Sequence, residues 1–107
     1  MPALQKEATA TTNDGLVITF KKPYPFEGKE YTEVNLSQLE QLSGEDMIET
    51  DRIFQSEGNF APVPEMTFAY ACILAARASD KPIEFFKGLP LKESVKLKNM
   101  VMGFLNN

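Results

Sequence analysis

The spacing of hydrophobic and polar positions first follows the period of strands. Residues 16–20 (LVITF) are a β-branched and aromatic run of strand length, and residues 31–36 alternate, so that even-numbered side chains point to one face and odd-numbered ones to the other. Pro23 and Pro25 are unsuited to a central ladder, whereas residues 27–29 (EGK) have turn chemistry. The pattern therefore predicts a hairpin with a long loop. Because an isolated hairpin is marginal in water, it must pack on the rest of the chain.

Beyond residue 36 the spacing becomes that of helices. Ser43, with a carboxylate three residues later, predicts a helix start, and Gly58 marks its end. Residues 66–76 are apolar at ten of eleven positions, which predicts a buried central helix, well short of the roughly twenty residues that span a bilayer. A short segment, 83–87, precedes a last helix that starts at Pro90. The first of these helices carries an apolar stripe of Met47, Ile48, Ile53 and Phe54.

The last helix has a wide apolar face, formed by Leu97, Met100, Val101, Phe104 and Leu105. Two interpretations remain open. Either this face packs on the central helix, or part of it, together with Phe85 and Phe86, stays open to a partner helix. Packing in the core is favoured because a chain of 107 residues needs most of its apolar surface to fold.

Together these elements predict an α+β, mainly helical fold in which an N-terminal two-stranded β-hairpin packs on about four helices. Residues 1–14 are rich in Ala and Thr and show no period, so we expect a flexible N-terminal arm that ends in turn chemistry at residues 13–15 (NDG). Residues 15–107 are then a single domain, as the length of the chain also indicates.

The composition removes many kinds of chemistry. Histidine is absent, which excludes Ser-His and Cys-His nucleophile pairs and most zinc sites. Cys72 is the one cysteine and lies in the apolar central segment, so we expect a buried, inert thiol. The N-terminal sequence has neither the basic start nor the apolar core of a signal peptide, which favours a cytoplasmic location.

Carboxylates could still serve as acid and base, and Asp46, Glu49 and Asp51 are the candidates. An acidic, solvated helix face explains them better, because nothing near them in the sequence indicates a pocket. No stretch has the spacing of a calcium loop, a dinucleotide-binding loop or a P-loop. We therefore expect no catalytic, cofactor-binding or metal-binding residues, and a histidine-free enzyme remains only a distant alternative.

Charge is distributed unevenly. The net charge of −4 argues against nucleic-acid binding. Tyr24, Phe26 and Tyr31 lie near lysines and could stack on bases, but nearby glutamates cancel that charge, which favours a loop packed on the core. Residues 40–57 contain six acids and one base, whereas residues 87–98 contain four bases and one acid. Two solvated helix faces are the simpler interpretation. Complementary patches that steer salt-sensitive self-association are the other.

Residues 16–105 resemble the tail assembly chaperones of long-tailed bacteriophages and prophages. The resemblance rests on the order of the elements and on the phrases KPYPFEGKEYTEV, LSGEDMIE and KPIEFFKGLP. It implies a non-enzymatic protein of the host bacterial cytoplasm, absent from the mature virion, that coats the helical tape measure protein and helps recruit the major tail protein. Such families commonly produce a second, longer form by ribosomal frameshifting.

A chaperone for a long amphipathic helix needs an apolar surface and no catalytic chemistry. We therefore expect partner contacts at Phe85, Phe86, Met100, Phe104 and Leu105. A small phage or prophage adaptor, such as a tail-completion protein with a different partner, is the alternative function.

Overall fold

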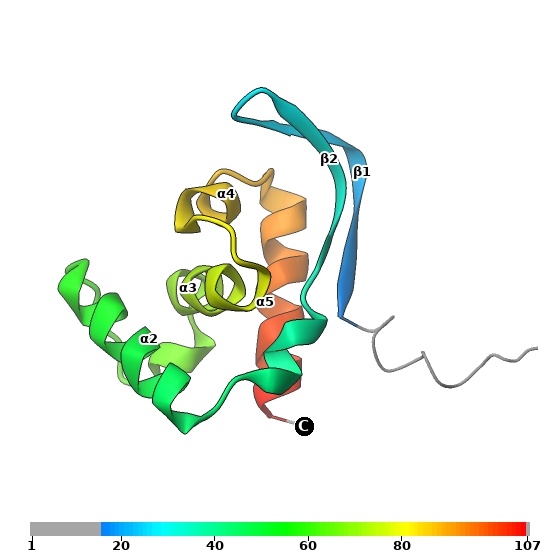
Figure 1. The fold of residues 1–107 in the computed structure, drawn as a ribbon. Coiled ribbons are helices and arrows are strands. Elements are labelled where there is room, and N and C mark those ends of the chain that lie inside the picture. Colours follow the sequence, from blue (N-terminus) through cyan, green and yellow to red (C-terminus); the bar gives the residue numbers. More distant parts are fainter. Residues whose placement is uncertain (1–15, 107) are drawn as a thin grey trace, which may run out of the picture.

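The structure, a computed structural model that describes residues 16–106, begins with a hairpin and continues into helices (Figure 1). The predicted arm and the turn at residues 13–15 lie outside the described residues. The elements, in order, are β1 (Val17–Phe26), β2 (Lys29–Asn35), the 3₁₀ helix η1 (Ser37–Gln41), α2 (Gly44–Ser56), the 3₁₀ helix η2 (Pro64–Met66), α3 (Phe68–Ser79), α4 (Ile83–Lys87) and α5 (Leu91–Leu105). This order confirms the predicted α+β, mainly helical fold.

The hairpin closes through a tight turn, so the expected long loop is wrong. Phe26 pairs with Lys29, which leaves only Glu27 and Gly28 between the strands. Both have positive φ, 48° and 83°, as a two-residue hairpin turn of type I′ requires. Pro25 is tolerated within β1 because each strand of a two-stranded sheet has a free edge.

An irregular register changes which side chains of β2 face the helices. Ile18 pairs with Val34, but the partner of Tyr24 is Tyr31, so β1 contains three more residues than β2 between these two pairs. This odd offset brings Tyr31 onto the same face as Val34 and leaves Thr32 exposed. The simple alternation of residues 31–36 therefore does not continue through the hairpin.

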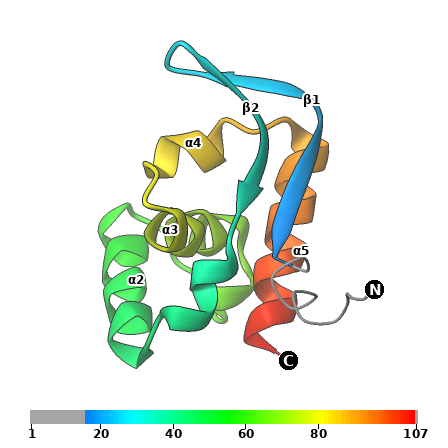
Figure 2. The same cartoon turned by 45° about the vertical axis from the view of Figure 1, so that its right-hand side comes forward.

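The centre of the fold is α3, which lies between α2 and α5 (Figures 1 and 2). Thr67 caps its start by accepting a hydrogen bond from the backbone N–H of Tyr70 at 3.2 Å. Residues 70–76 are all buried, which confirms the predicted central helix, but Met66 belongs to η2 and is 48% exposed. Cys72 has no exposed surface, and burial raises the pKa of its thiol to about 12, as expected for an inert cysteine.

The hairpin packs on α4 and α5. Tyr24, which is buried, donates its hydroxyl hydrogen bond to the backbone carbonyl of Phe85 at 2.8 Å. The rings of Tyr24, Phe26 and Tyr31 each lie 5.0–5.2 Å from the Phe85 ring, centroid to centroid, in edge-to-face arrangements. These contacts confirm that the aromatic residues of the hairpin pack on the core.

A second link joins β1 to α5. The backbone N–H of Lys21 donates to Glu93 Oε2 at 3.0 Å, and Lys96 Nζ lies 3.3 Å from Glu93 Oε1. The Lys21 hydrogen bond and the Lys96 cation lower the pKa of the Glu93 carboxyl. Glu93 is therefore buried as a paired carboxylate.

Helix α2 begins and ends as predicted, but its apolar stripe is only partly in the core. The backbone N–H of Ser43 donates to Asp46 Oδ2 at 2.8 Å, one arm of a capping box, and Gly58 follows the helix with a φ of 85°. Phe54 is buried, whereas Met47 and Ile48 are 42% and 70% exposed. The reason is that α2 is a peripheral helix that packs mainly on α3, so its outer side chains have no neighbouring element.

Candidate functional site

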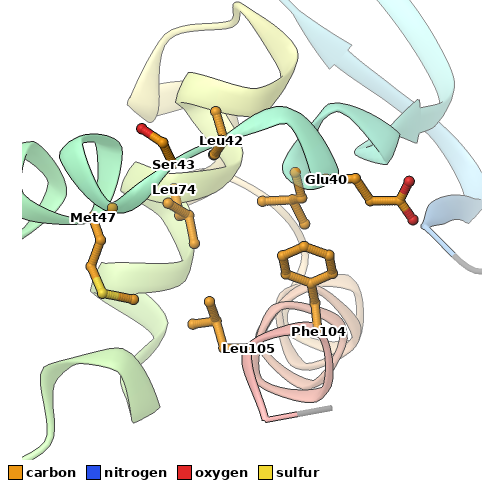
Figure 3. A pocket seen from close by; sticks show the side chains of 9 residues that line it. Glu40, Leu42, Ser43, Met47, Leu74, Phe104 and Leu105 are labelled. Carbon is orange, nitrogen blue, oxygen red and sulfur yellow. The ribbon is translucent and has the colours of Figure 1, made fainter.

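An apolar groove of about 240 Å³ opens where the end of α5 approaches the segment from η1 to α2 (Figure 3). Phe104 and Leu105 come from α5, and Leu74 of α3 lies between them and α2. The complete lining is Leu39, Glu40, Leu42, Ser43, Gly44, Met47, Leu74, Phe104 and Leu105. Three segments far apart in the sequence therefore form one surface.

Local structure fixes the upper wall of this groove. η1 places Leu39 in the core and Glu40 outside, and the capping box then sets the direction in which α2 starts. Met47 consequently lies one turn into α2, where its half-exposed side chain borders the groove. Because methionine is unbranched and flexible, it can adapt to differently shaped apolar partners.

Phe104 and Leu105, two of the five residues predicted to contact a partner, line the groove and are partly exposed. Met100 is half-buried one turn earlier on α5 and does not line it. Phe85 and Phe86 have no exposed surface at all. Their expected place on an open surface is therefore wrong: three rings of the hairpin pack on Phe85, and Phe86 packs against Phe85 in the core.

Sequence reasoning missed the other wall of the groove. Leu39 and Leu42 belong to a segment whose period was too short to define a face, and Leu74 belongs to a helix that is apolar all round. Met47 belongs to the predicted apolar stripe of α2, but nothing in the sequence places it beside α5. The signal that the sequence offered is an apolar residue, Met47, directly after the polar first turn of a helix.

Acidic side chains lie around the groove, but their carboxylates do not point into its apolar interior. The Glu40 carboxylate points away from the apolar side chains (Figure 3). Asp46, just beyond the groove, forms an ion pair with Arg77 of α3 at 2.6 Å. The hydrogen bond from the Ser43 backbone, and then that from Arg77, lower the pKa of the Asp46 carboxyl. The groove thus presents an apolar interior beside a charged rim.

The groove suits side chains better than a small molecule. Its volume is below the roughly 300 Å³ at which ligand pockets usually begin. Within residues 16–106, no three histidine, cysteine, aspartate or glutamate side chains gather where they could hold a metal ion. No helix of the same residues is long and apolar enough to cross a membrane.

Comparison with known families gives one match. Residues 17–106 match the family model described as phage tail assembly chaperone proteins, E, or 41 or 14. Neither the curated proteins nor the solved structures contain a match. The matched span starts at the first residue of β1 and ends one residue beyond α5, so it includes every residue that lines the groove.

Proposed function

Because the chain belongs to the phage tail assembly chaperone family, we propose that it binds the tape measure protein while the tail is being built and helps to recruit the major tail protein. It acts in the cytoplasm of the host bacterium and is absent from the finished virion. Its role is to keep apolar helical segments of its partner from aggregating until the tail tube covers them.

The observation that carries this proposal is the open apolar groove between α5 and the start of α2. An amphipathic helix presents apolar side chains three or four residues apart along one face. The groove has room for one or two such side chains, with Phe104 on one side and Met47 on the other. Each copy therefore binds a short stretch of the partner helix, and many copies along one partner form a stable coat through repeated weak contacts.

The rim of the groove favours a particular helix. Glu40 lines the groove and forms no ion pair with another described residue, so a basic residue flanking the inserted apolar side chains meets a complementary charge. An acidic helix would be repelled. The groove therefore favours segments in which lysine or arginine accompanies leucine, methionine or phenylalanine.

Co-expression with the tape measure protein tests the proposal directly. The expected product is a complex with many copies of this chain per partner, measured by size-exclusion chromatography with mass determination. A partner that is intact in solution and elutes alone would contradict tape measure binding and would favour an adaptor that uses a different partner.

Substitutions in the groove test the site. Phe104→Glu places a charge in the apolar interior and should weaken binding at least tenfold, as expected for loss of a central anchor. Phe60→Glu is the matched control, because Phe60 is 92% exposed and lies outside the groove. Met47→Glu changes the opposite wall at a half-exposed position and provides the answer if Phe104→Glu unfolds the chain. Full binding by a folded Met47→Glu variant would refute the groove as the site.

A further inference from the structure

A second apolar surface surrounds the start of α5, away from the groove. Leu91 and Val95, one turn apart on α5, are 80% and 49% exposed. Two hollows of about 400 and 520 Å³ lie beside them, one toward Phe68 of α3 and the other toward the prolines of β1. Leu91 lines both hollows. We refer to Leu91, Val95 and Phe68 as the α5 surface.

Lysines border this surface. Lys21, Lys22 and Lys92 line one hollow, and Lys98 lines the other, together with Lys87, which pairs with Glu57. Within residues 16–106, none of the first four lysines forms an ion pair with a carboxylate. Glu93 also lines the first hollow, but its carboxylate already accepts a hydrogen bond from the Lys21 backbone N–H and forms an ion pair with Lys96. The α5 surface is therefore an apolar centre with a net positive border.

The outer face of α2 has the opposite character. Ile48, which is 70% exposed, lies between Glu45 three residues before it and Asp51 three residues after it. Side chains at this spacing are neighbours on a helix surface. Neither carboxylate forms an ion pair with another described residue. We refer to Glu45, Ile48 and Asp51 as the α2 ridge. It is an apolar centre with an acidic border.

We propose that the α2 ridge of one copy docks on the α5 surface of a second copy of this chain. Ile48 then covers Leu91 and Val95, while Glu45 and Asp51 face the lysines. Such a contact removes exposed apolar surface from both partners and pairs charges that have no partner within the described part of one chain. A second copy is the occupant because this chain itself carries the complementary ridge.

The two surfaces determine the type of assembly. α2 and α5 lie on opposite sides of α3, so the ridge and the surface of one copy do not meet each other (Figures 1 and 2). A contact between different faces is heterologous, and repeating it produces a ring or an open helical row of copies. Neither Ile48 nor Leu91 lines the groove, which stays available on every copy.

Mixing two defective variants tests this contact on the purified chain, without any tape measure protein. Ile48→Lys spoils the ridge, and the new lysine can pair along the helix with Glu45 and Asp51. Leu91→Glu spoils the α5 surface, and a carboxylate in the first turn of a helix is favourable for its stability. Each variant alone should be a monomer, whereas their mixture should give a dimer through the intact ridge of one and the intact surface of the other.

Further measurements complete the test by sedimentation or size-exclusion chromatography with mass determination. Phe60→Lys, the matched control, and Phe104→Glu should associate as the wild type does. Lys92→Glu combined with Lys98→Glu should raise the dissociation constant at least tenfold, and it replaces Leu91→Glu if that variant does not fold. Association should also weaken at high salt, because charges on a surface are screened beyond roughly 10 Å at 0.1 M salt.

Several results would overturn the proposal. These are a wild-type chain that stays monomeric at high concentration, folded single variants that associate like the wild type, and a variant mixture that remains monomeric. None of them bears on the groove, because tape measure binding is measured separately. Conversely, loss of partner binding with intact self-association would refute the proposed function and leave this contact standing.

Discussion

At the scale of single residues, Tyr24 joins the hairpin to α4 through a buried contact that leaves little space. Its hydroxyl donates to the carbonyl of Phe85, and a Cβ added at Gly88 would lie 2.7 Å from that hydroxyl oxygen. Gly88 has a negative φ of −89°, so the backbone itself would accept another residue. Glycine is required here by the close approach of Tyr24.

We therefore expect Tyr24→Phe and Gly88→Ala to be coupled. Tyr24→Phe should lower the free energy of unfolding by about 1–2 kcal/mol, because the Phe85 carbonyl loses its buried donor. Gly88→Ala should cost a similar ~1–2 kcal/mol by displacing the hydroxyl. In the double variant the alanine has more room, so its cost should be smaller by at least about 0.5 kcal/mol. Chemical denaturation of the four proteins checks this, and simple additivity would show that the two residues do not compete for space.

At the scale of elements, the start of α2 depends on one carboxylate with two tasks. Asp46 accepts a hydrogen bond from the Ser43 backbone N–H and pairs with Arg77 of α3. The first contact caps α2, and the second holds it against the central helix. This arrangement also keeps the η1–α2 wall of the groove in place.

The lowered pKa of Asp46 predicts a pH dependence. Because the carboxylate is favoured in the folded chain, its stabilising effect is complete above the usual pKa of about 3.9 and is lost as pH falls through the lower folded-state value. Asp46→Asn should therefore lower the melting temperature by a few degrees at neutral pH, and the difference from wild type should shrink steadily below pH ~4. A difference that stays constant down to pH ~2 would contradict a role for the charge.

At the scale of the whole molecule, Phe85 joins the hairpin to the helices. Its ring contacts Tyr24, Phe26 and Tyr31 of the hairpin and also Phe86, and it has no exposed surface. A two-stranded hairpin has little stability of its own, so its order depends on this contact.

We expect Phe85→Ala to lower the free energy of unfolding by about 3–5 kcal/mol. Two of the three tyrosines, Tyr24 and Tyr31, lie in the hairpin, so tyrosine fluorescence reports mainly on it, while far-UV circular dichroism reports on the helices. In the wild type both signals should change at the same denaturant concentration. An earlier fluorescence transition would instead show that the hairpin detaches before the helices unfold.

Only some residues of the candidate site can be predicted from the spacing of apolar residues in the sequence. Phe104 and Leu105 could be found from the sequence, because α5 is long enough for its apolar face to be read from the spacing. Phe85 and Phe86 could not be assigned, since a helix of five residues has too few turns to show which side is covered. Leu39, Leu42 and Met47 become part of a site only when η1 and α2 lie beside the end of α5.

The sequence by itself determined the order of the elements, the start and end of α2, the buried central helix and the inert Cys72. These properties depend on contacts between near neighbours in the chain, or on an apolar character strong enough to force burial. Only the tertiary structure decided the tight hairpin with its irregular register, the burial of Phe85 and Phe86, and the groove. Each of these depends on which distant segments pack together, and local spacing does not specify that choice because the same apolar face can be covered by the chain itself or left open to a partner.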